Sequence, residues 1–134
     1  MQAQRDTAAE ERYIVVVDDD AAVRNSLKFS LEAEGFSVHV FADGQELLRQ
    51  RALPDCGCLV VDQNLPGICG IDLIASLRER QVSVPAVLIT SHPNKRLQAH
   101  AAHAGIPIVE KPLLGSTLID TIRRAMTRAQ AGLN

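Results

Sequence analysis

Four short apolar runs in the chain each end in polar or charged side chains. The runs, each given with the residues that follow it, are 13–17 with Asp18-Asp19-Asp20, 58–61 with Asp62, 86–89 with Thr90-Ser91, and 106–109 with Glu110-Lys111-Pro112. Apolar runs of this length between turn-forming residues predict buried strands. A carboxylate at the end of a buried strand is costly unless something there uses its charge. If the strands are parallel, their carboxyl ends bring these side chains to one edge of a sheet, where open α/β sheets bind ligands.

Segments with apolar residues at helical spacing lie between the runs. We expect helices at about 21–34, 43–48, 70–80, 95–104 and from 116 or 117 to about 128, and a further strand at 36–41. Five strands that alternate with five helices predict a doubly wound α/β fold, in which helices cover both faces of a parallel sheet. The helix at 95–104 is rich in alanine and histidine and only weakly apolar, so we expect it to be mobile.

The size and composition of the chain suit one globular domain. It has 134 residues, of which 46% are hydrophobic and 22% charged, and its formal net charge of -2 gives no case for nucleic-acid binding. No apolar run is long enough to span a membrane, and residues 1–12 lack the apolar core of a signal peptide. We therefore expect a cytoplasmic protein with reduced cysteines, organised as a flexible arm at 1–11, a domain at 12–128 and a tail at 129–134.

The polar residues at the predicted strand ends resemble the motifs of response-regulator receiver domains of two-component signalling. The matching positions are Asp18-Asp19 after the first strand, Asp62 after the third, Thr90 after the fourth and Lys111-Pro112 after the fifth. Each alone is a weak signal, whereas all four in this order and at similar spacing are specific. The resemblance covers residues 12–128 and is strongest to receivers often joined to a helix-turn-helix output domain. It implies a flavodoxin-like parallel sheet with strand order 2-1-3-4-5.

The same side chains suit phosphoryl transfer on chemical grounds. A carboxylate such as that of Asp62 can attack phosphorus and carry the phosphoryl group as an acyl phosphate, a reaction that needs mainly positioning and charge neutralisation. Three clustered carboxylates repel one another, and Mg²⁺, which prefers oxygen ligands, relieves that repulsion. We expect Asp19 and Asp62 to be direct ligands, with Asp18 acting directly or through water. The Lys111 ammonium and the Thr90 hydroxyl can contact phosphoryl oxygens that the metal does not reach.

The resemblance also implies further roles and partners. The backbone carbonyl of Asn64 would complete the protein ligands of Mg²⁺, and a cis peptide bond would precede Pro112. A histidine kinase or phosphotransfer protein would supply the phosphoryl group to Asp62, and the domain would catalyse its own phosphorylation and dephosphorylation without being a conventional enzyme. Binding of a partner, or a homodimer, would use the face of the fourth helix, fifth strand and fifth helix, with no direct contact to nucleic acid or membrane.

Ile108 departs from the family pattern three residues before Lys111, where tyrosine or phenylalanine is usual. In receivers, the hydroxyl at the Thr90 position and this aromatic ring are the switch residues that move on phosphorylation. Ile108 has no ring, and a β-branched side chain is stiff about χ1. We therefore expect the loop at 91–95 and the helix after it to carry the change. Gln63 is a second departure, because a hydrophobic residue is more usual directly after the phosphoacceptor.

Three other interpretations stay open from the sequence. A pseudo-receiver would keep the fold and signal by constitutive binding or dimerisation, which the intact acidic set disfavours and Ile108 favours. A metal-dependent phosphatase would need a second acid two residues after its nucleophile, where Asn64 stands. Zinc could bind Cys56, Cys58 and Cys69 together with a histidine, although the spacing of the cysteines is unusual for such a site.

Overall fold

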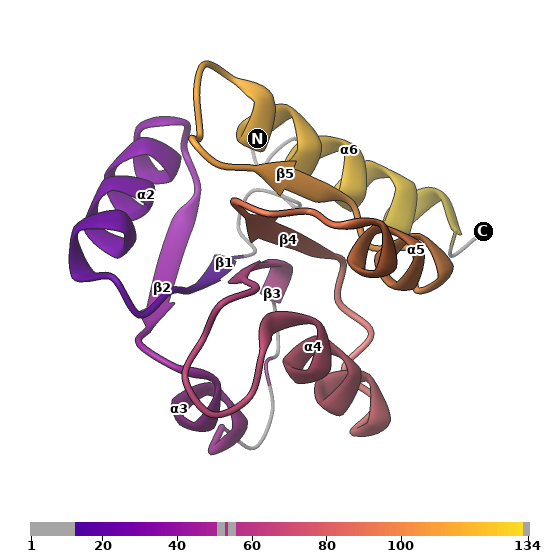
Figure 1. The fold of residues 1–134 in the computed structure, drawn as a ribbon. Coiled ribbons are helices and arrows are strands. Elements are labelled where there is room, and N and C mark those ends of the chain that lie inside the picture. Colours follow the sequence, from indigo (N-terminus) through magenta and orange to yellow (C-terminus); the bar gives the residue numbers. More distant parts are fainter. Residues whose placement is uncertain (1–12, 51–52, 54–55, 133–134) are drawn as a thin grey trace.

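The computed structural model describes residues 13–50, 53 and 56–132, which form a parallel sheet between two layers of helices (Figure 1). The strands are β1 (Tyr13–Val17), β2 (Ser37–Phe41), β3 (Cys56–Asp62), β4 (Ala86–Thr90) and β5 (Ile108–Glu110). The helices are α2 (Ala21–Ala33), α3 (Gly44–Leu48), α4 (Gly70–Glu79), α5 (Lys95–His103) and α6 (Thr117–Gly132). The strand order β2-β1-β3-β4-β5 confirms the predicted doubly wound topology. The arm expected at 1–11 lies outside the described residues.

Alternate side chains of the central strands fill two hydrophobic cores. In β1, Ile14 and Val16 pack with α2 and α6, whereas Val15 and Val17 pack with α3, α4 and α5. Figure 1 shows these two groups of helices on opposite sides of the sheet. Every residue of β3 is buried, as a central strand of a parallel sheet requires. Because both cores fix the strands in register, the residues at their carboxyl ends are held on a rigid base.

The fifth strand begins at Ile108, two residues later than the expected start at Ile106. Gly105 has a positive φ of 73°, and the Ile106 N–H donates at 2.8 Å to a carbonyl in the last turns of α5, so both residues belong to the end of that helix. Pro107 has no N–H to give to the sheet and contributes only its carbonyl, which accepts from the Leu88 N–H at 3.0 Å. The expected strand was therefore too long at its start.

Helix α6 continues to Gly132, past the end expected near Arg128. Residues 129–131 are Ala-Gln-Ala, which are good helix formers, and no proline interrupts them. The tail expected at 129–134 therefore begins inside the helix, and only residues 133–134 lie beyond it, outside the described part of the chain.

A β-bulge at the start of β3 separates two of the cysteines. Tyr13 pairs with Cys56 and Ile14 pairs with Cys58, which leaves Gly57 as the extra residue. Cys56 consequently packs in the core under α3, α4 and α5, and Cys58 in the core under α2 and α6. The zinc hypothesis is wrong, because these two side chains lie on opposite faces of the sheet. Within the described residues, no group of three metal-ligating side chains contains a cysteine.

Only one of the three cysteines should react rapidly with iodoacetamide in the native protein. Burial raises the pKa of Cys56 to about 11 and raises the pKa of Cys58 well above its usual value, and the thiolate is the reactive form. Cys69 is only half-buried, at the start of α4. Intact mass should show one fast adduct, which peptide mapping should place on Cys69, and three adducts in denaturant. Two or more adducts under native conditions would contradict the burial of β3.

Candidate functional site

Three polar side chains are buried where β1, β3 and β4 end. Asp62 closes β3 and is 4% exposed, Thr90 closes β4 and is 1% exposed, and Asp18, directly after β1, is 1% exposed. Asp19, next to Asp18, is exposed. Since parallel neighbours place their carboxyl ends at the same edge, the sheet order brings together residues that are far apart in the sequence, as the strand-end pattern predicted.

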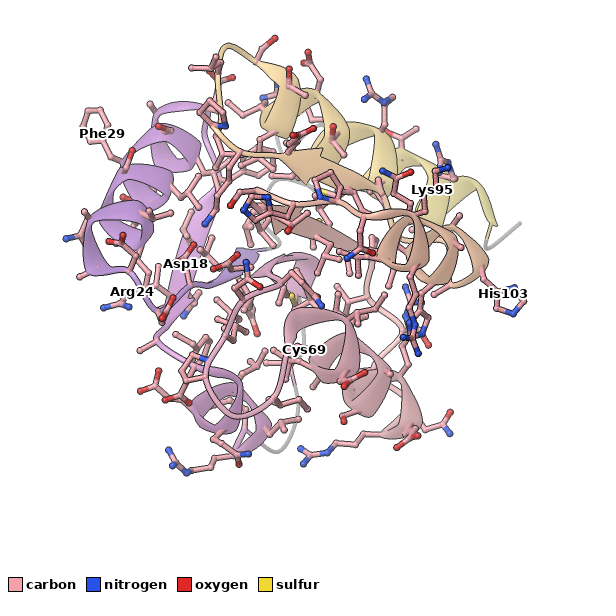
Figure 2. All side chains as sticks on the ribbon, viewed as in Figure 1. Asp18, Arg24, Phe29, Cys69, Lys95 and His103 are labelled. Atoms are coloured by element: carbon pink, nitrogen blue, oxygen red, sulfur yellow. The ribbon has the colours of Figure 1, made fainter. Side chains whose placement is uncertain are left out.

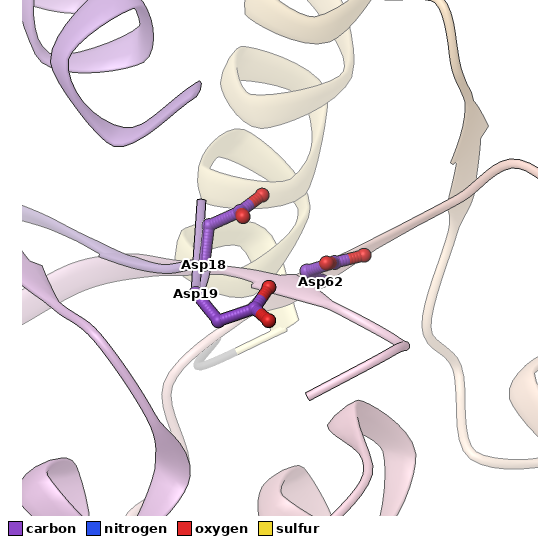
Figure 3. A group of neighbouring side chains, drawn as sticks. All are labelled: Asp18, Asp19 and Asp62. Carbon is purple, nitrogen blue, oxygen red and sulfur yellow. The ribbon is translucent and has the colours of Figure 1, made fainter. Parts of the chain in front are cut away.

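The carboxylates of Asp18, Asp19 and Asp62 form one cluster (Figure 3). One oxygen from each residue lies within 4.8 Å of the others. The second oxygen of Asp18, Oδ2, is buried and has no hydrogen-bond partner among the described residues. A buried carboxylate oxygen without a partner is unfavourable by itself. The cluster is therefore arranged for a positively charged group.

The turn after β1 is fixed by hydrogen bonds to its own side chains. Asp18 Oδ1 accepts from the Asp20 N–H at 2.9 Å. Asp20 caps α2, accepting from the N–H groups of Ala22 at 2.9 Å and Val23 at 3.3 Å, as expected for this residue. Arg24, one turn into α2, donates from Nη1 to the Asp18 carbonyl at 2.7 Å, and Figure 2 shows the two residues side by side. These contacts hold the acidic pair at the edge of the sheet.

Lys111 reaches the cluster from the end of β5. Its Nζ lies 3.5 Å from Asp62 Oδ1 and 3.8 Å from Asp18 Oδ2, and its side chain is 27% exposed. The Lys111 N–H donates to the Thr90 carbonyl at 2.9 Å, which ties the residue to β4. The peptide bond between Lys111 and Pro112 is cis, as the family resemblance implied. The lysine thus stands beside two buried carboxylates.

Burial raises the pKa values of two of the carboxyl groups. For Asp18, desolvation is the largest cause, partly opposed by the Asp20 N–H and the Lys111 ammonium. For Asp62, desolvation comes first and repulsion from Asp18 second, and Lys111 again opposes them. One lysine therefore does not compensate for the buried negative charge, and the carboxylates favour a bound cation.

The donor set fits Mg²⁺ in its chemistry. The cluster offers oxygen ligands only, from two strand ends, and includes the buried Asp18 Oδ2, which has no hydrogen-bond partner among the described residues. Hard divalent cations such as Mg²⁺ prefer a few carboxylates together with carbonyls and water. Asn64, the remaining expected ligand, follows β3 by two residues, and its N–H donates to Asp62 Oδ1 at 3.4 Å.

Thr90 and Ile108, the two expected switch residues, lie on the neighbouring strands β4 and β5. Thr90 Oγ1 accepts from the His92 N–H at 3.2 Å, so the hydroxyl is linked to the loop before α5. Ile108 is half-buried and pairs in register with Leu88, two residues before Thr90. Thr90 thus ends β4, the strand that pairs with the strand of Asp62, and Ile108 lies two residues before Glu110, the β5 residue that pairs with Thr90.

Gln63 has a structural role that the sequence did not reveal. Its Oε1 accepts from the Ile71 N–H at 2.9 Å, and its carbonyl accepts from the Gly70 N–H at 3.0 Å. The sequence offered one indication of this role, because Cys69 stands at the N-cap position of α4 and cysteine is not among the preferred N-cap residues. The missing cap is supplied from the residue directly after Asp62.

Comparison with known proteins decides the family. A family model described as response regulator receiver domain matches residues 14–123, which include the whole cluster. The chain belongs to the response-regulator receiver family. As a receiver domain of a two-component response regulator, it has the strand order and helix placement described above.

Two curated relatives and one solved structure illustrate the relationship of this receiver domain to longer proteins. The transcriptional regulatory protein FixJ of Bradyrhizobium diazoefficiens is 37% identical over 121 residues, which are 88% of this chain and 58% of FixJ. The C4-dicarboxylate transport transcriptional regulatory protein DctD of Pseudomonas aeruginosa is 32% identical over 114 residues, 84% of this chain and 25% of DctD. The crystal structure of FixJ-N is similar with a TM-score of 0.77 and 31% identity, covering 87% of this chain and 94% of that one. The chain therefore spans at most 58% of these curated relatives.

Across residues 13–50 and 56–132, no helix combines the length and the apolar character needed to cross a bilayer.

Proposed function

We propose that this receiver domain accepts a phosphoryl group on Asp62 in a Mg²⁺-dependent reaction. The observation that carries the proposal is a buried carboxylate that ends the central strand, between two further aspartates and the Lys111 ammonium at 3.5 Å. An ordinary solvated carboxylate has neither the neighbouring cation nor the grouped oxygens. Acyl phosphate formation needs both a positioned nucleophile and neutralised charge.

The chemistry of the transfer assigns a task to each side chain. An Asp62 carboxylate oxygen attacks phosphorus, and the O–P bond forms as the bond from phosphorus to an imidazole nitrogen of the donor breaks, with the electron pair kept by that nitrogen. Lys111, already beside Asp62, holds its ammonium on a phosphoryl oxygen. The Thr90 hydroxyl donates its hydrogen to another oxygen. Bound Mg²⁺ would neutralise the charge shared by the carboxylates and the phosphoryl group.

Asp18, Asp19, Asp62 and the Asn64 carbonyl are the residues that would hold Mg²⁺. Hydrolysis of the acyl phosphate by the same site would make the domain a phosphorelay component that catalyses its own phosphorylation and dephosphorylation. A sensor histidine kinase or phosphotransfer protein of the cytoplasm is the proposed donor. The proposed output is a changed face of α5, β5 and α6, which binds a partner or a second copy without contacting nucleic acid itself. The pseudo-receiver alternative is disfavoured, because the complete set of carboxylates and Lys111 meets in one cluster.

Labelling by a small phosphodonor tests the proposed function. With Mg²⁺, the intact mass should rise by one phosphoryl group that is stable in acid and labile in base. With a chelator in place of Mg²⁺, the mass should stay unchanged over the same time. Equal labelling with and without divalent cation would contradict a metal-dependent site.

Millimolar Mg²⁺ should raise the melting temperature of the natural protein and raise that of Asp19→Asn much less. A ligand that binds only the folded state adds RT ln(1 + [L]/Kd) to the unfolding free energy, about 2.7 kcal/mol at one hundred times Kd. Asp19 is exposed, so its substitution removes a ligand without opening the core. Thermal denaturation with and without Mg²⁺ is the measurement. An equal rise in both proteins would remove Asp19 from the ligand set.

Transmission from Asp62 should depend on the loop at 91–95 and α5 rather than on Ile108. Ile108 has no ring, and a ligand shifts an equilibrium only by its different affinity for two states. Ile108→Ala should therefore keep the changes in amide chemical shift that a phosphoryl mimic causes in α5 of the natural protein. If the alanine variant folds and labels normally but loses those changes, Ile108 is a required relay and this prediction is wrong.

A further inference from the structure

Gln63 makes three hydrogen bonds, one to β4 and two to the start of α4. Its N–H donates to the Ile89 carbonyl of β4 at 2.8 Å. Its carbonyl accepts from the Gly70 N–H at 3.0 Å, and its side-chain Oε1 accepts from the Ile71 N–H at 2.9 Å. Gly70 and Ile71 are the first two residues of α4. The residue after Asp62 therefore joins the end of β3 to β4 and to the start of α4.

The start of α4 differs from those of α2, α3 and α5. Those three helices are capped by the residue just before them, Asp20, Asp43 and Asn94, whose side chains accept backbone N–H groups of the first turn. In the described structure of α4, the residue in that position, Cys69, makes no such bond. Gln63 supplies the cap from across the loop. A first-turn N–H without a partner would be costly, so the helix start depends on Gln63.

Close packing of the backbone shows how tightly the loop is closed. A Cβ atom added to Gly70 would lie 2.6 Å from the Asp62 carbonyl oxygen and 2.9 Å from the Gln63 Cα. The two ends of the loop at 63–70 are thus in direct contact beside the phosphoacceptor. Asn64, whose carbonyl is a proposed Mg²⁺ ligand, directly follows Gln63 and therefore lies next to this contact.

We propose that Gln63 is a positioning residue, whose side-chain bond to Ile71 fixes the closed loop so that Asp62 and the Asn64 carbonyl face the divalent cation. The inference rests on the proposed function, since it concerns the Mg²⁺ site described there. It follows that binding of the cation and order at the start of α4 are coupled. A hydrophobic side chain in place of Gln63 can fill the same space but cannot accept the Ile71 N–H. Partners that orient metal ligands without touching the metal typically change metal affinity by about 10- to 100-fold.

Three variants separate positioning from ordinary helix capping. Gln63→Met keeps the length of the side chain and loses the acceptor. Gln63→Glu keeps an acceptor oxygen and places it at a helix N-terminus, where a negative charge is favourable. Asn94→Ala is the matched control, because it removes the 2.8 Å side-chain cap of α5 on the Leu97 N–H.

Backbone amide NMR provides both readouts without any turnover. In the Mg²⁺ titration, Gln63→Met should bind about tenfold more weakly than the natural protein, whereas Gln63→Glu should bind no more weakly and Asn94→Ala should be unchanged. In hydrogen exchange without Mg²⁺, Ile71 and Gly70 should lose protection in Gln63→Met and keep it in Gln63→Glu. In the natural protein, Mg²⁺ should increase the protection of both amides, a result that needs no variant to fold.

The outcomes distinguish this proposal from the function on which it rests. Two results would overturn the role of Gln63 alone, provided that the natural protein binds Mg²⁺. One is an Mg²⁺ affinity of Gln63→Met equal to that of the natural protein, and the other is a loss of Mg²⁺ affinity in Asn94→Ala as large as that in Gln63→Met. Unchanged protection of Ile71 on adding Mg²⁺ to the natural protein would overturn the coupling. A natural protein that binds no Mg²⁺ would overturn both the proposed function and this inference.

Discussion

Asp62→Asn should lose all labelling by a small phosphodonor and, without Mg²⁺, should melt at a higher temperature than the natural protein. The substitution removes the nucleophile, and it also removes a buried charge that lies beside Asp18. We expect a gain on the order of 1 kcal/mol, or a few degrees in melting temperature. Asp20→Asn is the matched control: Asp20 is exposed, and asparagine caps a helix as well as aspartate does. Undiminished labelling of Asp62→Asn would sink the assignment of the phosphoacceptor.

The same variant should flatten the dependence of stability on pH when divalent cations are absent. The folded state raises the pKa of Asp18 and Asp62 above the ordinary value of 3.8, so the folded state holds these protons more tightly than the unfolded state. Their contribution to stability is fully present below pH 3.8 and is lost as the pH rises through the raised values. Denaturant titrations at several pH values should show a smaller loss in Asp62→Asn. An identical slope in both proteins would show that Asp62 is not destabilised by burial.

Gly70→Ala, at the first residue of α4, should destabilise the protein strongly. The added Cβ would meet the Asp62 carbonyl oxygen at 2.6 Å and a Leu88 methyl at 2.8 Å, so the backbone of β3 or the start of α4 must move. Overpacking of this kind costs about 1–3 kcal/mol, and contact with backbone places the variant in the upper part of that range. The expected result is a lower melting temperature together with slower labelling, because the shift acts on Asp62 itself.

Gly44→Ala is the matched control for this prediction. The three atoms nearest to its added Cβ would be the Ile68 Cγ2 methyl at 2.5 Å and two Leu73 methyls at 3.3 and 3.4 Å. These are side-chain atoms away from Asp62, so the clash acts on the core and not on the backbone of the site, and alanine favours the helix more than glycine does. We expect a smaller loss of stability and an unchanged rate of labelling. If Gly70→Ala is as stable as the natural protein and labels as fast, the loop is not closed as tightly as the structure indicates.

Much of this fold could be predicted because the residues of its central strands are almost all apolar. Residues 13–17 and 58–61 are nearly continuous apolar runs bounded by turn-forming residues, as is typical of central parallel strands that have helices on both faces. The site followed from the same feature, since carboxylates placed at strand ends must meet when the strands are parallel. The less accurate predictions concerned the ends of helices and strands, which depend on single residues such as glycine and proline. Because of Gly105 and Pro107, β5 begins at Ile108, later than expected, and because no proline interrupts Ala-Gln-Ala at 129–131, α6 ends later than expected.

The features that escaped prediction depend on contacts between a side chain and distant backbone. The Gln63 side chain bonds to an N–H eight residues away, and Arg24 bonds to the Asp18 carbonyl six residues away. Neither contact follows a helical or strand period, so no pattern in the sequence indicates it. The bulge at Gly57 is similar, because it shows only in the pairing of β1 with β3. These contacts decide how the site is oriented, whereas the periodic pattern decides only where it lies.

The central claim is that Asp62 carries the phosphoryl group, and reduction of the labelled protein tests it most directly. Borohydride converts the acyl phosphate of an aspartate to homoserine and leaves free carboxylates unchanged, so the labelled residue acquires a permanent mass difference. After labelling with Mg²⁺, peptide mapping should find homoserine at position 62 and aspartate at 18 and 19. Homoserine at Asp18 or Asp19, or at no position in a protein that gained the phosphoryl mass, would contradict the account.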